Sequence, residues 1–218
     1  MKAQRLNHVF FILGLALIAS ELWKQWCLTM TVNEGVYDWW YFPFQLCSLP
    51  MYLLPAFLRV KNQQMRTALL AFLMDYTLLG SIMVWADTSG LFYPLTALTL
   101  HSFLWHILLT VIGLLSGFAW RRETKRTGRD FFYATLLYGT GCLTAAFLNA
   151  LLRGKGEMNM FYINPEVPVT QPFFRHLIPV IGQVPTIILY MLATVAGAGI
   201  LHGLWGVKHS DITPQASA

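Results

Sequence analysis

A few ionisable and polar side chains interrupt otherwise apolar stretches of this sequence, and these are the residues that could do chemistry. The ionisable ones are Glu21, Asp75, His101, His106 and His202, and the uncharged ones are Gln45, Cys47 and Asn149. A charged side chain within a bilayer costs several kcal/mol unless it faces the inside of a helical bundle, so each of them is a functional candidate by default. Their spacing along a helix indicates which of them face inward.

His106 is the strongest candidate for a general base, because histidine titrates near neutral pH. Helix positions three, four and seven residues away share its face, and these are Thr99, Ser102, Thr110 and Gly113. We expect this stripe of small and polar residues to face other helices. His101 lies about 140° around the same helix, so the two imidazoles should not enter one narrow site. The alternative for either histidine is a plain hydrogen bond to a neighbouring carbonyl.

A metal centre is the less favoured interpretation of these residues. A metal-dependent hydrolase built from His101, His106 and Asp75 stays an alternative, but the angular separation of the histidines argues against it. The three cysteines, Cys27, Cys47 and Cys142, have no CxxC spacing and indicate neither a disulfide framework nor a thiolate metal site. We therefore expect neither a metal nor another cofactor.

The favoured chemistry is acyl transfer or hydrolysis on a lipid. His106 would take a proton from Cys47 in a covalent route, or from the hydroxyl of the acceptor in a direct one. Glu21 or Asp75 would orient the imidazole. The substrate-binding candidates, which could also stabilise an oxyanion, are Gln45, Asn149 and Asn159.

Each candidate also has a structural alternative. Glu21 could be an interfacial acid, Asp75 a helix-locking hydrogen bond, Cys47 a small buried thiol, and His202 a side chain that snorkels to water. If the site is not catalytic, the same polar residues would make a lipid or small-molecule binder or carrier.

The elements that position these residues are predicted to be membrane helices. Of 218 residues, 56% are hydrophobic and 11% charged, and the mean hydropathy is +0.52, which excludes a soluble enzyme, a disordered chain and a nucleic-acid binder. Apolar stretches long enough to cross a bilayer run near 8–27, 41–59, 66–86, 96–120, 130–152 and 183–206. We expect an all-α, polytopic membrane bundle of six transmembrane helices in one domain over residues 1–218. The first span is interpreted as a retained helix and not as a signal peptide, and the second contains three prolines.

The positions of lysine and arginine predict the orientation. With the N-terminus in the cytoplasm, the inner segments hold eleven of these residues and the outer segments four, so both termini should be cytoplasmic. The basic run 121–129 is then a topology anchor, and the connection 153–182 is an ordered loop or lid outside. Glu21, Gln45, Cys47 and Asn149 all fall in the outer half of the bilayer. A polar site that opens outward beneath this loop would gather them, in a multi-pass protein of a bacterial cell membrane whose partner is a membrane lipid and not a nucleic acid.

Several short motifs support this interpretation. Pro43-Phe44-Gln45-Leu46-Cys47, followed by a proline-rich apolar helix, resembles the P-x-H-L-C segment of the YwaF-like family of bacterial integral membrane proteins. Further matches follow in order along the chain: Phe92-Tyr93-Pro94, Phe103-Leu104-Trp105-His106, Asn149, Asn159-Met160-Phe161, Asn164-Pro165, Gly182, Pro185 and Tyr190. The resemblance implies six membrane helices.

A remote eukaryotic relative of that family, transmembrane protein 164, is regarded as a phospholipid acyltransferase that uses a cysteine and a histidine. The resemblance matches its histidine to His106, whereas its cysteine falls at Phe44. Gln45 replaces the motif histidine of the bacterial family, and Cys47 matches the bacterial cysteine. The resemblance therefore implies a base at His106 and leaves the nucleophile open between Cys47 and the acceptor.

Overall fold

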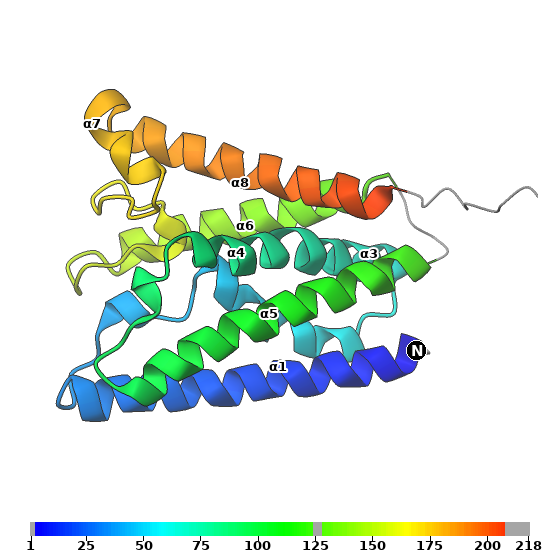
Figure 1. Cartoon of the computed structure of the whole chain (residues 1–218), viewed down its shortest axis with the longest axis horizontal. Coiled ribbons are helices and arrows are strands. Elements are labelled where there is room, and N and C mark those ends of the chain that lie inside the picture. Colours follow the sequence, from blue (N-terminus) through cyan, green and yellow to red (C-terminus); the bar gives the residue numbers. More distant parts are fainter. Residues whose placement is uncertain (1–2, 124–127, 208–218) are drawn as a thin grey trace, which may run out of the picture.

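The computed structural model describes residues 3–123 and 128–207, and in these ranges the chain is a bundle of helices without strands (Figure 1). Within this described part of the chain, five helical rods are long and apolar enough to cross a membrane. Three of them are single helices: α5 (Thr96–Arg122), α6 (Asp130–Leu151) and α8 (Gln183–Gly206). The first rod is α1 (Ala3–Trp26), which a π-helical turn over Cys27–Val32 extends. The second rod consists of α3 (Gln63–Phe72) and α4 (Leu78–Met83), which are joined by the π-helical Leu73–Thr77, and it ends in the 3-10 turn Val84–Ala86. Their bounds agree with five of the six predicted spans to within about six residues.

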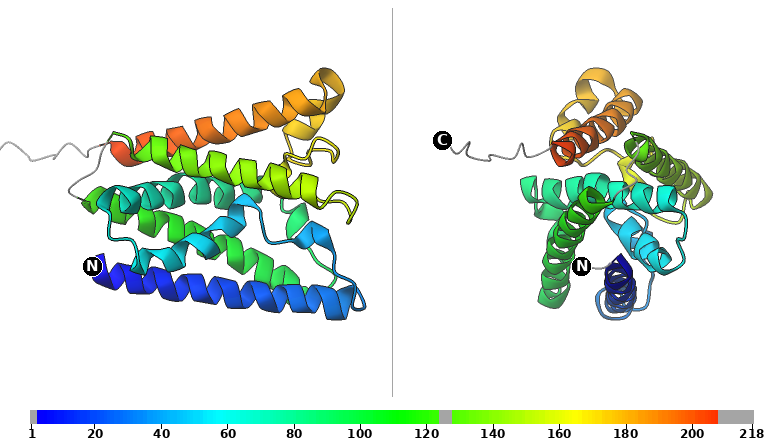
Figure 2. Two further views of the ribbon diagram at one scale, coloured as in Figure 1. Left: turned by 180° about the vertical axis from the view of Figure 1, so that it is seen from behind. Right: turned by 90° about the vertical axis from the view of Figure 1, so that its right-hand side faces the viewer.

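The remaining predicted span, 41–59, is shorter and broken. After the 3-10 turn Trp39–Tyr41 the chain is irregular, and helical structure resumes only over Leu46–Leu58, where α2 (Leu49–Leu53) lies between the 3-10 turns Leu46–Ser48 and Leu54–Leu58. Proline has no N–H to donate and clashes with the preceding turn, and Pro50 and Pro55 each begin a new helical piece. The segment still runs from one end of the bundle to the other (Figure 2).

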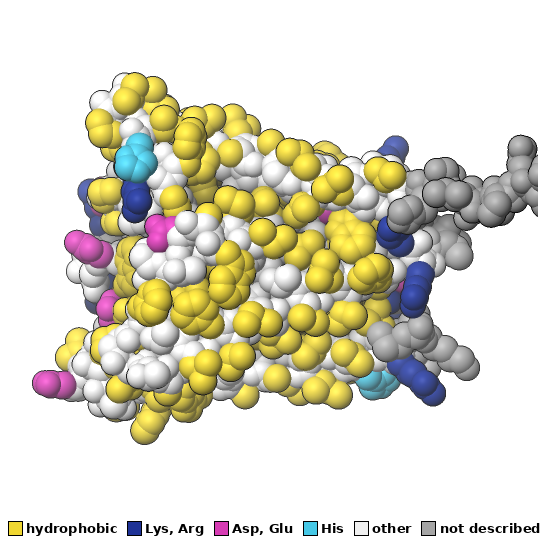
Figure 3. Space-filling model, in the orientation of Figure 1, with side chains coloured by type: hydrophobic (Ala, Val, Ile, Leu, Met, Phe, Trp, Pro, Cys, Tyr) yellow, Lys and Arg dark blue, Asp and Glu magenta, His cyan; other side chains and the backbone are white. Residues whose placement is uncertain are grey.

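The rod formed by α3 and α4 is the centre of the bundle. In its most apolar stretch 67% of the residues are buried, against 22–39% in the other four rods, whose outer sides are apolar and exposed. Charged side chains gather at the two ends of the molecule, and the flank between them is largely apolar (Figure 3). This distribution is typical of a protein whose flank contacts lipid.

The loops of the described residues lie at the two ends of the bundle. The N-terminal end of α1, the 59–62 loop and the C-terminal ends of α5 and α8 lie at one end of the bundle (Figure 1). The 33–45, 87–95 and 152–182 connections lie at the other end. Of the basic residues used to predict the orientation, Lys2, Lys125, Arg126 and Lys208 lie outside the described residues.

Glycine allows α1 to pack closely on the broken segment. A Cβ at Gly14 would lie 2.6 Å from Pro55 Cδ and 3.0 Å from Leu54 Cβ. A proline ring cannot rotate away, so the helix would have to shift. We expect Gly14→Ala to lower the free energy of unfolding by about 2 kcal/mol, measured as a lower Tm in detergent.

Gly139→Ala is the matched control, because a Cβ at Gly139 in α6 would meet nothing within 4 Å. This change should leave the Tm unchanged or raise it, since alanine favours the helix. Equal Tm values for the two variants would show that the α1 packing at Gly14 is looser than the structure has it.

Candidate functional site

His106 faces the inside of the bundle, as its helical periodicity predicts. Its side chain is 9% exposed, and Ser102 and Gly113 on the same face of α5 are also buried. The imidazole Nδ1 lies 2.8 Å from the Ser102 carbonyl oxygen. Because a carbonyl can only accept, Nδ1 is the protonated nitrogen of the neutral ring, and Nε2 is left with the lone pair of a base.

His101 has different surroundings. Its ring lies 5.6 Å, between centroids, from each of Trp23 and Trp105, and neither of its buried ring nitrogens has a hydrogen-bond partner within the described chain. The two histidines therefore make separate contacts. Within the same residues no group of three or more His, Cys, Asp or Glu side chains is arranged to hold a metal ion.

The segment that carries Cys47 is joined directly to the helix of His106. Trp105, the neighbour of His106 in α5, donates a hydrogen bond from Nε1 to the Cys47 carbonyl at 3.2 Å. Cys47 itself is half-buried with a free thiol. The structure thus places the predicted base and the cysteine on two elements that touch each other.

Glu21 forms an ion pair with Lys24, which was not among the predicted site residues. Lys24, one turn further along α1, lies 2.8 Å from Glu21 Oε1, and Gln25 donates a hydrogen bond to the same oxygen at 2.7 Å. The Lys24 ammonium acts electrostatically on Cys47, His106 and also His101. The i, i+3 spacing of an acid and a base was the signal that could have identified this pair.

Tyr93 adds a hydroxyl to the same region from the 87–95 loop. Its ring lies 5.6 Å from that of Tyr41, and it interacts electrostatically with Glu21 and Cys47. Burial raises the pKa of Tyr93, and Tyr41 and Glu21 act in the same direction. The hydroxyl therefore stays protonated at neutral pH and is available as a hydrogen-bond donor.

Gln45 and Asn149 hold the long loop on the bundle. Asn149 accepts a hydrogen bond from the Met160 N–H at 2.8 Å and donates one to the Met160 carbonyl at 3.2 Å. Gln45 donates to the Asn159 carbonyl at 2.9 Å and accepts from the Phe161 N–H at 2.8 Å. Each amide uses both its oxygen and its nitrogen in hydrogen bonds to the loop backbone, and these contacts position the loop. The substrate-binding role expected for them stays a prediction.

Asn159 organises the loop from within. It is buried, accepts a hydrogen bond from the Asn164 N–H at 2.9 Å and donates to the Val167 carbonyl at 3.2 Å. Gln183 at the start of α8 donates to the same Val167 carbonyl at 2.7 Å. Phe161 has a φ of 58°, in the left-handed region that few non-glycine residues adopt. These contacts join residues 159–167 to one another and to the start of α8.

Asp75 does not orient His106. It is 0% exposed in the π-helical turn of the central rod, and its Oδ2 lies 2.8 Å from Nδ1 of His202 in α8. The His202 ring packs against Trp120 and Phe131, at centroid distances of 5.0 and 5.2 Å. The expectation that His202 snorkels to water is therefore wrong, because a buried carboxylate needs a hydrogen-bonded partner and His202 supplies it.

The arrangement groups the predicted site residues in three places. Glu21 pairs with Lys24, whose charge acts on Cys47, His101 and His106, and Tyr93 interacts with Glu21 and Cys47 from the 87–95 loop. Gln45, Asn149 and Asn159 hold the loop, and Asp75 forms a separate buried pair. The first group combines a base, a thiol and an ammonium, residue types that acyl transfer can use.

The comparisons agree with the membrane architecture. The sequence model of the TMEM164 family matches residues 1–202 of the chain. No curated protein and no solved structure shows a significant match.

Proposed function

Because the chain belongs to the TMEM164 family, and is thus a multi-pass membrane protein, we propose that it transfers or hydrolyses an acyl chain of a glycerophospholipid with His106 as the general base. One observation carries the proposal. The Ser102 carbonyl holds Nδ1 of a buried histidine, which leaves Nε2 with the lone pair, and the preceding residue, Trp105, donates a hydrogen bond to the segment of Cys47. Because every neutral imidazole keeps one such lone pair, the adjacent Cys47 segment is what distinguishes His106 from a structural histidine.

In the covalent route, Nε2 takes the proton of the Cys47 thiol and the thiolate attacks the ester carbonyl carbon of the lipid. The bond to the glycerol oxygen breaks, and this oxygen takes the proton from the imidazolium. The resulting thioester passes its acyl group to the hydroxyl of a second lipid or of water, and that proton returns to the thiol through His106. In the direct route His106 deprotonates the acceptor hydroxyl, and no thioester forms.

The neighbouring residues have supporting roles in this proposal. The positive charge of Lys24, partly balanced by Glu21, would attract the oxyanion or the lipid phosphate. The loop held by Gln45, Asn149 and Asn159 would act as a lid over the site.

A purified-protein assay tests the proposal. The protein is reconstituted with a phospholipid that carries one isotope-labelled acyl chain, together with an unlabelled lysophospholipid, and the products are measured by mass spectrometry. Transfer of label to the lysophospholipid, or release of labelled fatty acid, supports the enzyme. Lipid that stays bound but unchanged supports the second candidate, a non-catalytic lipid binder or carrier.

One observation favours that second candidate. The position that the resemblance matches to the nucleophile of the remote relative holds Phe44. Its ring lies 5.7 Å from the ring of Phe161 in the long loop. An aromatic contact with the loop makes this position structural.

We also propose that the chain crosses the plasma membrane of a bacterium six times with both termini in the cytoplasm. Lys155→Cys should react with an impermeant thiol reagent in intact cells, in a background without the three native cysteines. Lys61→Cys, exposed at the opposite end, should react only after permeabilisation. The excess of lysine and arginine at the inner end is the physical reason. The opposite labelling pattern would reverse the orientation.

A further inference from the structure

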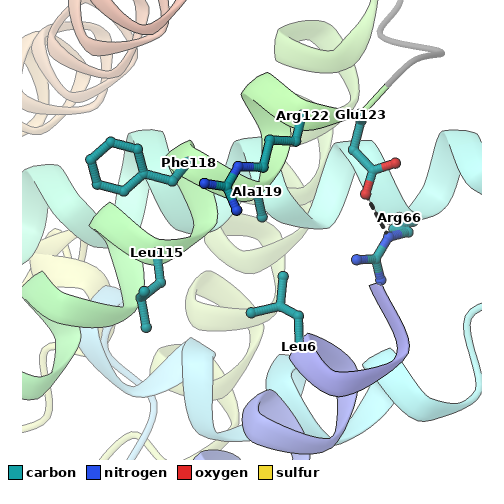
Figure 4. A pocket seen from close by; sticks show the side chains of 7 residues that line it. All are labelled: Leu6, Arg66, Leu115, Phe118, Ala119, Arg122 and Glu123. Carbon is teal, nitrogen blue, oxygen red and sulfur yellow. Dashed lines mark hydrogen bonds and ion pairs between the residues drawn. The ribbon is translucent and has the colours of Figure 1, made fainter. Parts of the chain in front are cut away.

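A cavity of about 210 Å³ opens at the end of the bundle opposite the long loop, where α1, the start of α3 and the end of α5 meet (Figure 4). One wall is apolar and includes Leu6, Leu115 and Phe118. The other wall is charged and consists of Arg66, Arg122 and Glu123. Sixteen residues separate Arg122 from His106 along α5, which corresponds to about 24 Å, so this cavity is distinct from the site proposed above.

Arg66 is buried with one nitrogen unused. Arg66 is 6% exposed. Its Nε donates a hydrogen bond to Glu123 Oε1 at 2.9 Å, and its Nη1 donates one to Asn7 Oδ1. Nη2 is buried and has no partner within the described residues. The guanidinium also lies over the Phe57 ring, 5.7 Å from its centroid, so the charge of Arg66 is held inside the wall of the cavity.

Arg122 places a second guanidinium over the same cavity. It lies in the last turn of α5 and is exposed, and Figure 4 shows its side chain above the space between Leu115 and Arg66. Glu123 is the negative charge that faces the two cations. Its Oε1 accepts from Arg66, and its Oε2 accepts a hydrogen bond from Gln63 at 2.6 Å. Two arginines and one glutamate give the described lining of the cavity a net charge of one positive unit.

We propose that this cavity binds the phosphate of an anionic glycerophospholipid. Guanidinium groups bind phosphate oxygens in bidentate geometry, and the exposed guanidinium of Arg122 supplies the donors, while the charge of Arg66, buried in the wall, adds to the attraction. The apolar wall indicates a lipid and not a soluble anion as the source of the phosphate. Phe118 is 54% exposed on the flank of the bundle, so an acyl chain can lie along it while the phosphate reaches Arg122.

Lipid binding to the full-length protein in detergent tests this inference. Dioleoyl phosphatidylglycerol, dioleoyl phosphatidylcholine and inorganic phosphate are titrated separately, and bound ligand is counted by native mass spectrometry. We expect phosphatidylglycerol to bind best. Arg122→Gln should weaken its binding roughly tenfold, because one charge-assisted contact is lost. Arg59→Gln removes the same charge from an exposed position outside the cavity and should change the affinity less than about twofold.

A second variant keeps both charges and fills the space. Leu115→Trp should reduce phosphatidylglycerol binding while the Tm stays near that of the unchanged protein. Arg66→Gln is less informative about lipid binding, because it also breaks a buried ion pair and so lowers stability. Equal affinity for the two lipids, or equal losses of phosphatidylglycerol affinity in Arg122→Gln and Arg59→Gln, would show only the general attraction of a basic surface and overturn the inference. Inorganic phosphate that saturates the protein without lipid would also overturn it, since the occupant would then be a soluble anion.

Discussion

His106→Asn should lower acyl transfer or hydrolysis by at least about 100-fold without lowering the amount of protein in the membrane. Asparagine keeps a polar side chain of modest size that can still donate to the Ser102 carbonyl, the contact made by Nδ1. It cannot take a proton at neutral pH, so the function of Nε2 is lost. The measurement is the isotope-transfer assay with matched amounts of reconstituted protein.

His101→Asn is the control on the same helix. That side chain contacts the indole rings of Trp23 and Trp105 and does not share the Ser102 contact, so its loss should change the rate less than about threefold. Cys47→Ser then separates the two routes, because the direct route needs no thiol. Full activity of His106→Asn would make this histidine structural and leave the lipid binder as the better interpretation.

Asn149→Leu should release the long loop from the bundle. Leucine has nearly the same shape but leaves the buried N–H and carbonyl of Met160 without partners, at a cost of about 3 kcal/mol. Local opening should then be about 100-fold more frequent. Hydrogen exchange of the peptide that covers residues 159–163 measures this opening.

Thr144→Val is the matched control for this substitution. Thr144 lies on the exposed side of the same helix, and its hydroxyl bonds only to the carbonyl of Thr140 one turn earlier. Exchange in the 159–163 peptide should not change. If Asn149→Leu also leaves exchange unchanged but abolishes activity, the side chain contacts substrate, as the sequence analysis expected.

Local patterns in the chain were enough to predict most of the architecture. A bilayer requires about 20 apolar residues for each helix, so composition alone located the five long rods. The 3.6-residue period placed His106, Ser102 and Gly113 on one buried face, because a helix determines which residues share a side. The prolines indicated where the second span would break, although not that helical structure would begin only at Leu46.

The partners of the buried polar residues were decided by the tertiary structure. Asp75 and His202 are 127 residues apart, and Gln45 is 116 residues from Phe161, so no helical period relates them. Their pairing depends on which rods become neighbours and on the depth at which each side chain then lies. Periodicity determines the face of a helix from which a residue points, whereas the hydrogen-bond partner on the facing element is set by packing. The sequence by itself therefore determined the membrane helices, the inward histidine and the i, i+3 spacing of Glu21 and Lys24, and only the packed bundle assigned Asp75 to His202 and the amides to the loop.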